Sequence, residues 1–101
     1  MKGFGNMDNK KLIESIIIIK GELPETEYKE VFADIKEQFE QFKIEKMEEL
    51  GKKNLAYEVN KNKTGYYLDI EFYADNEDVK NLELFCRNNE DILKFIFVRK
   101  D

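Results

Sequence analysis

Residues 48–57 read EELGKKNLAY, and residues 65–68, which follow a polar stretch, read GYYL. Apolar and aromatic residues on both sides of the polar stretch are typical of strands, so we predict strands at residues 44–59 and 65–73. The connecting residues 60–65 read NKNKTG, and the glycine at the end of this segment is suited to a positive φ. The stretch therefore predicts a β-hairpin.

The residues before this hairpin predict a strand followed by a helix. Ile16–Ile19 are four consecutive isoleucines, and a β-branched run of this kind, bounded by Gly21, predicts a strand at residues 13–20. Pro24 is well placed near a helix start, and the acidic residues after it suit the positive end of the helix dipole. One apolar face of this helix is expected to pack on the sheet, through Tyr28, Phe32, Ile35, Phe39 and Phe42.

The residues after the hairpin predict a second helix and a last strand. Asp75 or Asn76 can cap the helix, and the paired asparagines at 88–89 can end it. The residues expected to face inward are Val79, Leu82, Phe85 and Cys86. With a strand at residues 92–99, the order becomes strand, helix, strand, strand, helix, strand. This order is typical of the α+β ferredoxin-like fold, a four-stranded antiparallel sheet with two helices on one face.

Composition limits the domain organisation and the kinds of site. The 101 residues, 42% of them hydrophobic, suffice for one domain, which we assign to residues 11–101 after an irregular extension at residues 1–10. One cysteine and no histidine argue against an internal disulfide and a transition-metal site, so no metal or other cofactor is expected. No membrane span or secretory signal is recognisable, so a cytoplasmic protein is expected.

The sequence offers little support for catalysis. It contains no histidine base and no glycine-rich phosphate loop, and its one serine, Ser15, lies in a predicted strand with no evident activating partner. Acyl-phosphate hydrolases of the same fold place an arginine in the first strand–helix loop, where residues 20–23 here read KGEL. We therefore expect no catalytic residues and no small-molecule substrate.

Two separate segments resemble the family of the sixth protein of the bacterial small ribosomal subunit. The first is the hairpin, with its glutamate-rich lead, Leu-Gly, basic pair, Leu-Ala-Tyr, turn and Gly-Tyr-aromatic sequence. The second contains LE at residues 82–83 and RNNEDILK at residues 87–94. The resemblance extends from about Ile13 to the C-terminus, with departures such as Glu58 in place of a common proline, which suggest a divergent member or a paralogue.

This resemblance implies a structural protein that binds small-subunit ribosomal RNA together with a basic partner, the eighteenth protein of the subunit. The net charge of −5, from 17 basic and 22 acidic residues, fits shared rather than independent RNA binding. The expected RNA contacts are Lys52, Lys53, Arg87, Lys94 and Arg99. Among these, Arg87 and Lys94 match basic positions of the family.

The open face of the sheet is the expected partner surface. Alternation along the third strand turns Leu68, Ile70 and Phe72 toward the helices and the intervening residues outward. The residues expected to bind the partner are Ile16, Ile18, Tyr67, Asp69, Glu71 and Tyr73. Asp69 and Glu71 argue against base stacking of the kind used by RNA-recognition modules. A non-ribosomal paralogue that uses its sheet for protein interaction or dimerisation stays the alternative.

Overall fold

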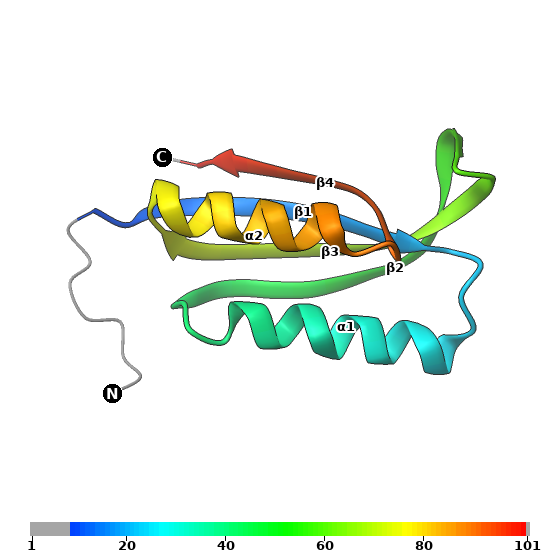
Figure 1. The fold of residues 1–101 in the computed structure, drawn as a ribbon, viewed down its shortest axis with the longest axis horizontal. Helices are drawn as coiled ribbons and strands as arrows, with labels where there is room; N and C mark the ends of the chain where they lie inside the picture. Colours follow the sequence, from blue (N-terminus) through cyan, green and yellow to red (C-terminus); the bar gives the residue numbers. More distant parts are fainter. Residues whose placement is uncertain (1–8, 101) are drawn as a thin grey trace.

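The computed structural model describes residues 9–100 and has the expected order of strands and helices (Figure 1). Every neighbouring pair of strands is antiparallel, and the order across the sheet is β2-β3-β1-β4. This arrangement confirms the ferredoxin-like fold. The elements are β1 (Lys11–Lys20), α1 (Glu25–Phe39), β2 (Ile44–Val59), β3 (Asn62–Ala74), α2 (Asn76–Asn88) and β4 (Ile92–Arg99).

Residues 1–8 of the predicted extension lie outside the described residues. Within residues 9–100, neither helix is both long enough and apolar enough to cross a lipid bilayer.

Both helices pack against the same face of the sheet and share one core with it. Alternate residues of β1 and β3 supply the sheet side of this core, including Ile17, Ile70 and Phe72, none of which is accessible to solvent. The buried residues of the helices are Tyr28, Val31, Ile35 and Phe39 of α1 and Leu82 and Cys86 of α2. In the part of the chain that the structure describes, the opposite face of the sheet therefore has no helix over it.

The predicted stripe of α1 needs two corrections. Val31 is buried where Phe32 was expected, and Phe32 is only partly buried. Phe42 is buried as expected, but it lies beyond the end of α1 at Phe39. One helix face can hold residues that are three or four apart, so either Val31 or Phe32 could share the face of Tyr28. The way α1 lies on the sheet buries Val31.

The predicted hairpin turn is shorter in the structure. Asn60 and Lys61 have φ values of 48° and 66°, and β3 already begins at Asn62, so the turn has two residues. The prediction that Gly65 supplies a positive φ at the end of the turn is wrong. Gly65 lies within β3, where an added Cβ atom would come within 2.4 Å of Ile18 Cγ2. This glycine is needed for close packing rather than for the turn.

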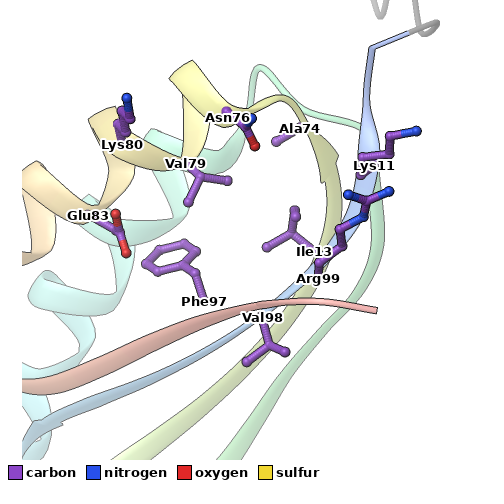
Figure 2. Close-up of a pocket in the computed structure, with 10 residues that line it drawn as sticks. All are labelled: Lys11, Ile13, Ala74, Asn76, Val79, Lys80, Glu83, Phe97, Val98 and Arg99. Carbon is purple, nitrogen blue, oxygen red and sulfur yellow. The ribbon is translucent and has the colours of Figure 1, made fainter. Parts of the chain in front are cut away.

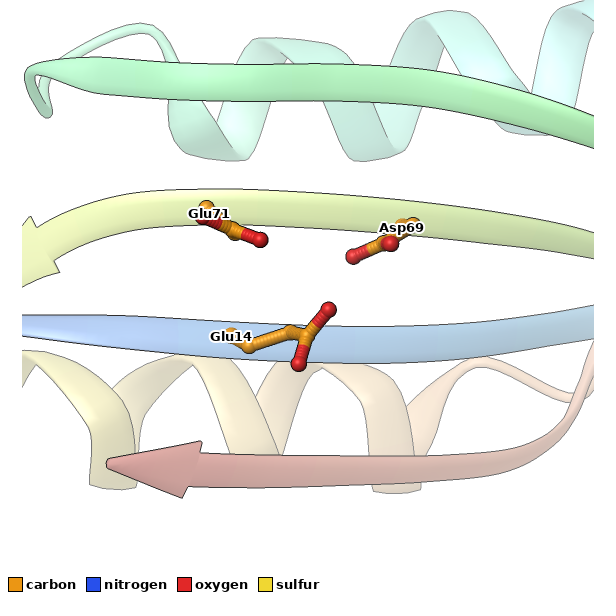
Figure 3. Close-up of side chains that lie close together, drawn as sticks. All are labelled: Glu14, Asp69 and Glu71. Atoms are coloured by element: carbon orange, nitrogen blue, oxygen red, sulfur yellow. The ribbon is translucent and has the colours of Figure 1, made fainter. Parts of the chain in front are cut away.

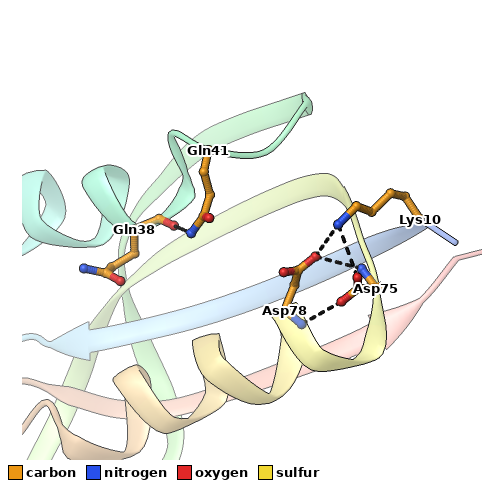
Figure 4. A network of polar contacts seen from close by, with 5 residues as sticks. All are labelled: Lys10, Gln38, Gln41, Asp75 and Asp78. Atoms are coloured by element: carbon orange, nitrogen blue, oxygen red, sulfur yellow. Dashed lines mark hydrogen bonds and ion pairs between the residues drawn. The ribbon is translucent and has the colours of Figure 1, made fainter. Parts of the chain in front are cut away.

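A hydrogen-bonded cap fixes the start of α2 (Figure 4). The backbone N–H of Asp78 donates to Asp75 Oδ1 at 2.8 Å, and the backbone N–H of Asp75 donates to Asp78 Oδ2 at 3.1 Å. Lys10 Nζ lies 2.7 Å from Asp78 Oδ2 and 3.3 Å from Asp75 Oδ2. The backbone N–H of Asp78 and the Lys10 ammonium group hold the pKa of Asp75 below its usual value.

At the end of α1, the side-chain amide of Gln41 donates a hydrogen bond to the backbone carbonyl of Gln38.

Candidate partner and nucleic-acid interface

The open face of the sheet is built from rows of residues that lie opposite one another on β3, β1 and β4. Tyr67 pairs with Ile18, which in turn pairs with Lys94. Two residues further from the hairpin, Asp69, Ile16 and Ile96 form the next row, and Glu71, Glu14 and Val98 form the one after it. Because side chains alternate along a strand, the three rows project from the same face. Ile16 and Ile18 are on this face, as predicted.

Three carboxylates meet at one end of this face (Figure 3). Glu14 extends from β1 toward Asp69 and Glu71 of β3, and oxygen atoms of all three side chains lie within 4.8 Å of one another. Asp69 is only 8% exposed, and its Oδ1 atom is buried without a hydrogen-bond partner among residues 9–100. Asp69 thus lies on the open face as predicted, but neighbouring side chains cover it, so it is not open to solvent.

Two lysines lie against this acidic cluster of Glu14, Asp69 and Glu71. Lys46 Nζ lies 2.9 Å from Asp69 Oδ2 and 3.4 Å from Glu71 Oε2. Lys100 Nζ lies 3.6 Å from Glu71 Oε2 and 3.9 Å from Glu14 Oε1. Carboxylate oxygens are also the ligands that hard cations prefer, but these ammonium groups already neutralise part of the charge. Three carboxylates and two lysines leave a net negative charge.

The carboxylates of β3 raise the affinity of Glu14 for a proton. The pKa of Glu14 lies above its usual 4.5, because its protonated carboxyl group can donate a hydrogen bond to Asp69, is partly desolvated and faces a like charge. The Lys46 pKa is raised as well, chiefly by its hydrogen bond with Asp69. The cluster is therefore a place where a further positive charge or a proton is favourable.

An apolar strip runs beside the acidic cluster. Ile96 and Val98 of β4 are 54% and 47% exposed, and Ile16 and Ile18 next to them are partly exposed. Exposed aliphatic side chains that adjoin one another are typical of interaction surfaces. The predicted residue Tyr73 lies at the far end of this face, with Lys43 Nζ 5.5 Å from the centre of its ring.

The two lysines of the basic pair on β2 turn toward opposite faces of the sheet. Lys53 Nζ lies 5.5 Å from the ring centre of Tyr67, on the open face. Lys52 Nζ lies 5.4 Å from the ring centre of Tyr66, which stacks on Tyr28 of α1 on the helix side. Because side chains alternate along a strand, the pair cannot serve one flat surface.

The other predicted RNA contacts are also separated. Lys94 projects from the open face, where its Nζ atom lies 5.5 Å from the ring centre of Tyr57. Arg87 lies near the end of α2, with its guanidinium carbon 6.0 Å from the ring centre of Phe95 on the helix side. Arg99 is the last residue of β4, at the end of the strand away from Lys94. Of the five basic residues, the structure thus brings only Lys53 and Lys94 to the hairpin end of the open face.

Arg99 borders a cavity between α2 and the ends of β1 and β4 (Figure 2). Its volume is about 350 Å³, and Ile13, Val79 and Phe97 line its interior. Its rim carries both charges, with Lys11, Lys80 and Arg99 opposed by Glu83. The three basic residues outnumber the one glutamate, so the charged rim is net positive.

Several residues of the open face were missed from the sequence. Alternation along residues 92–99 could have identified Ile96 and Val98, since Phe95 and Phe97 turn toward the helices and the residues between and after them turn outward. Glu14 could be recognised only once its pairing with Glu71 was known. The sequence carries no signal for the approach of Tyr57 to Lys94.

Known proteins are similar to most of this chain. The family described as ribosomal protein S6 matches residues 13–99. The small ribosomal subunit protein bS6 of Helicobacter acinonychis is 38% identical over 90 residues, which make up 87% of this chain and 63% of that protein. The bS6 protein of Helicobacter hepaticus is 40% identical over 88% of this chain and 66% of that protein. The chain thus spans just under two thirds of these relatives.

A solved structure agrees with this match. The crystal structure of 30S ribosomal protein S6 from Thermotoga maritima superimposes with a TM-score of 0.82 and is 31% identical in sequence. The superposition covers 90% of this chain and 88% of the Thermotoga chain. The matched residues include both segments on which the resemblance was based. By family match, sequence identity and fold, the chain belongs to the ribosomal protein S6 family.

Proposed function

We propose that this chain is a non-catalytic structural component of the small ribosomal subunit in the cytoplasm. In this proposal it binds small-subunit ribosomal RNA jointly with a basic partner, the eighteenth protein of the subunit. Membership of the ribosomal protein S6 family is the observation that carries the proposal. The charges and exposed residues of the open face support it and suggest how the two contacts are divided.

The acidic cluster and the apolar strip suit a basic, amphipathic partner. Net negative charge at Glu14, Asp69 and Glu71 would attract its cationic residues, and Ile96 and Val98 would cover its apolar ones. The partner would contact Ile16 and Tyr73 as well, and it would reach Ile18 and Tyr67 from the side of the acidic cluster, since Lys53 and Lys94 make the hairpin end basic. Asp69 is buried, and Lys46 pairs with its carboxylate. Asp69 would therefore contribute to partner binding through its negative charge and by holding Lys46 in place, and it would contact the partner directly only if the Lys46 side chain moved.

The RNA contacts would lie away from the acidic cluster. Lys53 and Lys94 share the hairpin end of the open face, whereas Lys52, Arg87 and Arg99 lie elsewhere and would reach RNA only if it wrapped around the domain. The chain's net charge of −5 opposes tight RNA binding without the partner.

A gel-shift experiment tests the joint binding. Central-domain ribosomal RNA is titrated with this protein, with the basic partner from the same organism, and with both together. We expect weak binding by this protein alone and a stable complex with both. Tight binding by the isolated chain would contradict the shared contact, and no effect of this protein on the partner's complex would contradict the proposed function.

A second candidate function follows from the exposed residues of β4. Ile96 and Val98 lie on an edge strand, and an uncovered apolar edge favours pairing with another chain. A paralogue outside the ribosome could use this surface for protein interaction or dimerisation. Sedimentation of a native lysate through a sucrose gradient separates the two, because a ribosomal component moves with the small subunit and a paralogue stays near the top.

A further inference from the structure

The arm formed by β2 and β3 brings Tyr57 to a position that its strand would not suggest. β2 and β4 are the two edge strands of the sheet, with β3 and β1 between them. The pairing of β2 with β3 is irregular between Asn54 and Val59. At this end the hairpin leaves the line of β2 and turns toward the side of the sheet on which β4 lies (Figure 1). As a result, Tyr57 of β2 meets Lys94 of β4, with 5.5 Å between the ammonium nitrogen and the ring centre.

Tyr57 is the most exposed of the large hydrophobic residues identified within residues 9–100. Its side chain is 69% exposed, and it borders a hollow of about 110 Å³ whose other walls include Ile18, Leu55, Tyr67 and Lys94. The hollow is smaller than the roughly 300 Å³ at which pockets for drug-sized molecules begin. It suits the insertion or stacking of one planar group.

Positive charge flanks this hollow. Lys94 lies over the Tyr57 ring, and Lys53 lies 5.5 Å from the ring centre of Tyr67. The acidic cluster begins one row further along β3, at Asp69, and extends away from the hairpin. An exposed aromatic ring with Lys94 over it and Lys53 against the neighbouring Tyr67 therefore lies at the hairpin end of the open face, beyond the acidic cluster.

We infer that Tyr57 is a stacking platform for one unpaired nucleobase of single-stranded RNA, with Lys94 and Lys53 contacting the adjacent phosphates. Aromatic rings stack on the π-face of any base, and lysines beside them follow the phosphate backbone. A basic partner protein would be repelled by these two lysines, so charge favours RNA here. The inference rests on the proposed RNA-binding function and adds an aromatic contact to it.

The test uses a fluorescent single-stranded RNA of about ten nucleotides and an abasic ribose–phosphate chain of equal length. Fluorescence anisotropy at several salt concentrations gives the affinity and its salt dependence. We expect Tyr57→Ala to weaken binding of the base-bearing RNA about 5- to 150-fold, while the log–log salt slope stays the same. Tyr57→Phe should retain most of the affinity, since stacking needs the ring and not the hydroxyl.

Controls separate stacking from charge. Lys94→Gln should reduce the salt slope by about 0.7, because one phosphate of the single strand is then no longer neutralised. Leu84→Ala, at an exposed residue of α2 outside both proposed contact surfaces, should change neither the affinity nor the slope. Tyr57→Ala and the original protein should bind the abasic chain equally. Equal binding of the base-bearing RNA by both, no measurable binding of it by either, or an equal weakening on the abasic chain would overturn the inference.

Failure of this inference can be distinguished from failure of the proposed function. If the original protein and its partner shift central-domain ribosomal RNA, and the Tyr57→Ala protein does so equally well, only the stacking role is wrong. If the original protein has no effect on that RNA with its partner present, the proposed function is wrong and the stacking role with it.

Discussion

The ring of Phe39 meets the ring of Phe72 edge to face, with 4.9 Å between the ring centres and 89° between their planes. This contact joins the last residue of α1 to β3 within the core, and the rings of Phe42 and Phe97 also approach Phe72. Tyr67, five residues earlier on the same strand, projects from the other face. The contact therefore separates residues that hold the fold from residues that are free to bind.

Substitutions of Phe72 and Tyr67 should affect different properties, stability in the first case and binding in the second. Phe72→Ala should lower the free energy of unfolding by about 3–5 kcal/mol, because it removes a fully buried ring. Tyr67→Glu should change it by about 1 kcal/mol or less but weaken binding of the basic partner or of RNA. Urea unfolding and gel shifts measure both. Equal destabilisation by the two substitutions would show that the assignment of faces is wrong.

Glu14 should make stability depend on pH. Its folded-state pKa is raised, so its contribution is fully present below the unfolded value, near 4.5, and is lost as pH rises through the folded value. Glu14→Gln should remove this loss and gain stability, relative to the original protein, as pH increases. The prediction is checked by measuring the urea midpoints of both proteins from about pH 3 to about pH 8, which includes the range over which carboxylates titrate.

Glu48→Gln is the matched control for Glu14. The Glu48 carboxylate lies 4.0 Å from Lys46 Nζ and is more exposed than that of Glu14. We expect its removal to leave the pH dependence almost unchanged. The same pH profile for both variants would indicate general surface charge rather than the acidic cluster.

The cap of α2 can be tested by comparing two substitutions of Asp75. Asp75→Ala removes the acceptor for the Asp78 N–H, whereas Asp75→Asn keeps an acceptor and loses the charge that attracts Lys10. The alanine variant should therefore unfold at the lower urea concentration. Because the pKa of Asp75 is lowered, its contribution to stability is present above the unfolded value and is lost as pH falls through the folded one. Equal midpoints for the two variants would exclude the side-chain cap.

Cys86 should be unreactive in the folded protein. Its thiol is buried, and burial together with the nearby Glu83 raises its pKa to about 12, so little thiolate exists near neutral pH. A disulfide reagent should label it only as fast as the chain opens, and at once in urea. A cysteine introduced as Leu84→Cys, at a position that is 52% exposed on the same helix, provides the accessible control in a Cys86→Ala background. Rapid labelling of native Cys86 would contradict the packing of α2.

Arg87 and Lys94 lie on opposite sides of the sheet, which allows their proposed RNA contacts to be separated. If each contacts one phosphate, Arg87→Gln and Lys94→Gln should each reduce the log–log salt slope by about 0.7–0.9, and the double variant by the sum. Binding of the basic partner should persist. Salt titrations of the three variants with the partner present measure this. An unchanged slope for Arg87→Gln alone would limit the RNA contact to the open face.

The sequence by itself determined the elements and their order. The isoleucine run, the helical stripe and the alternation around Phe72 identify strands and helices, since each reflects a local period of burial. The two family segments identified the relatives without reference to the fold. The facing of Ile16, Ile18 and Tyr67 also followed, because alternation along a strand is a property of its backbone.

Only the tertiary structure decided which open-face residues meet. Strand register places Glu14 against Glu71 and leaves Asp69 buried, and no local period encodes that pairing. The bend of the hairpin brings Tyr57 to Lys94 across the width of the sheet, which depends on the packing of four strands at once. Local sequence fixes which side of a strand a residue occupies, whereas contacts between distant strands depend on register, bulges and twist, which the whole sheet sets together.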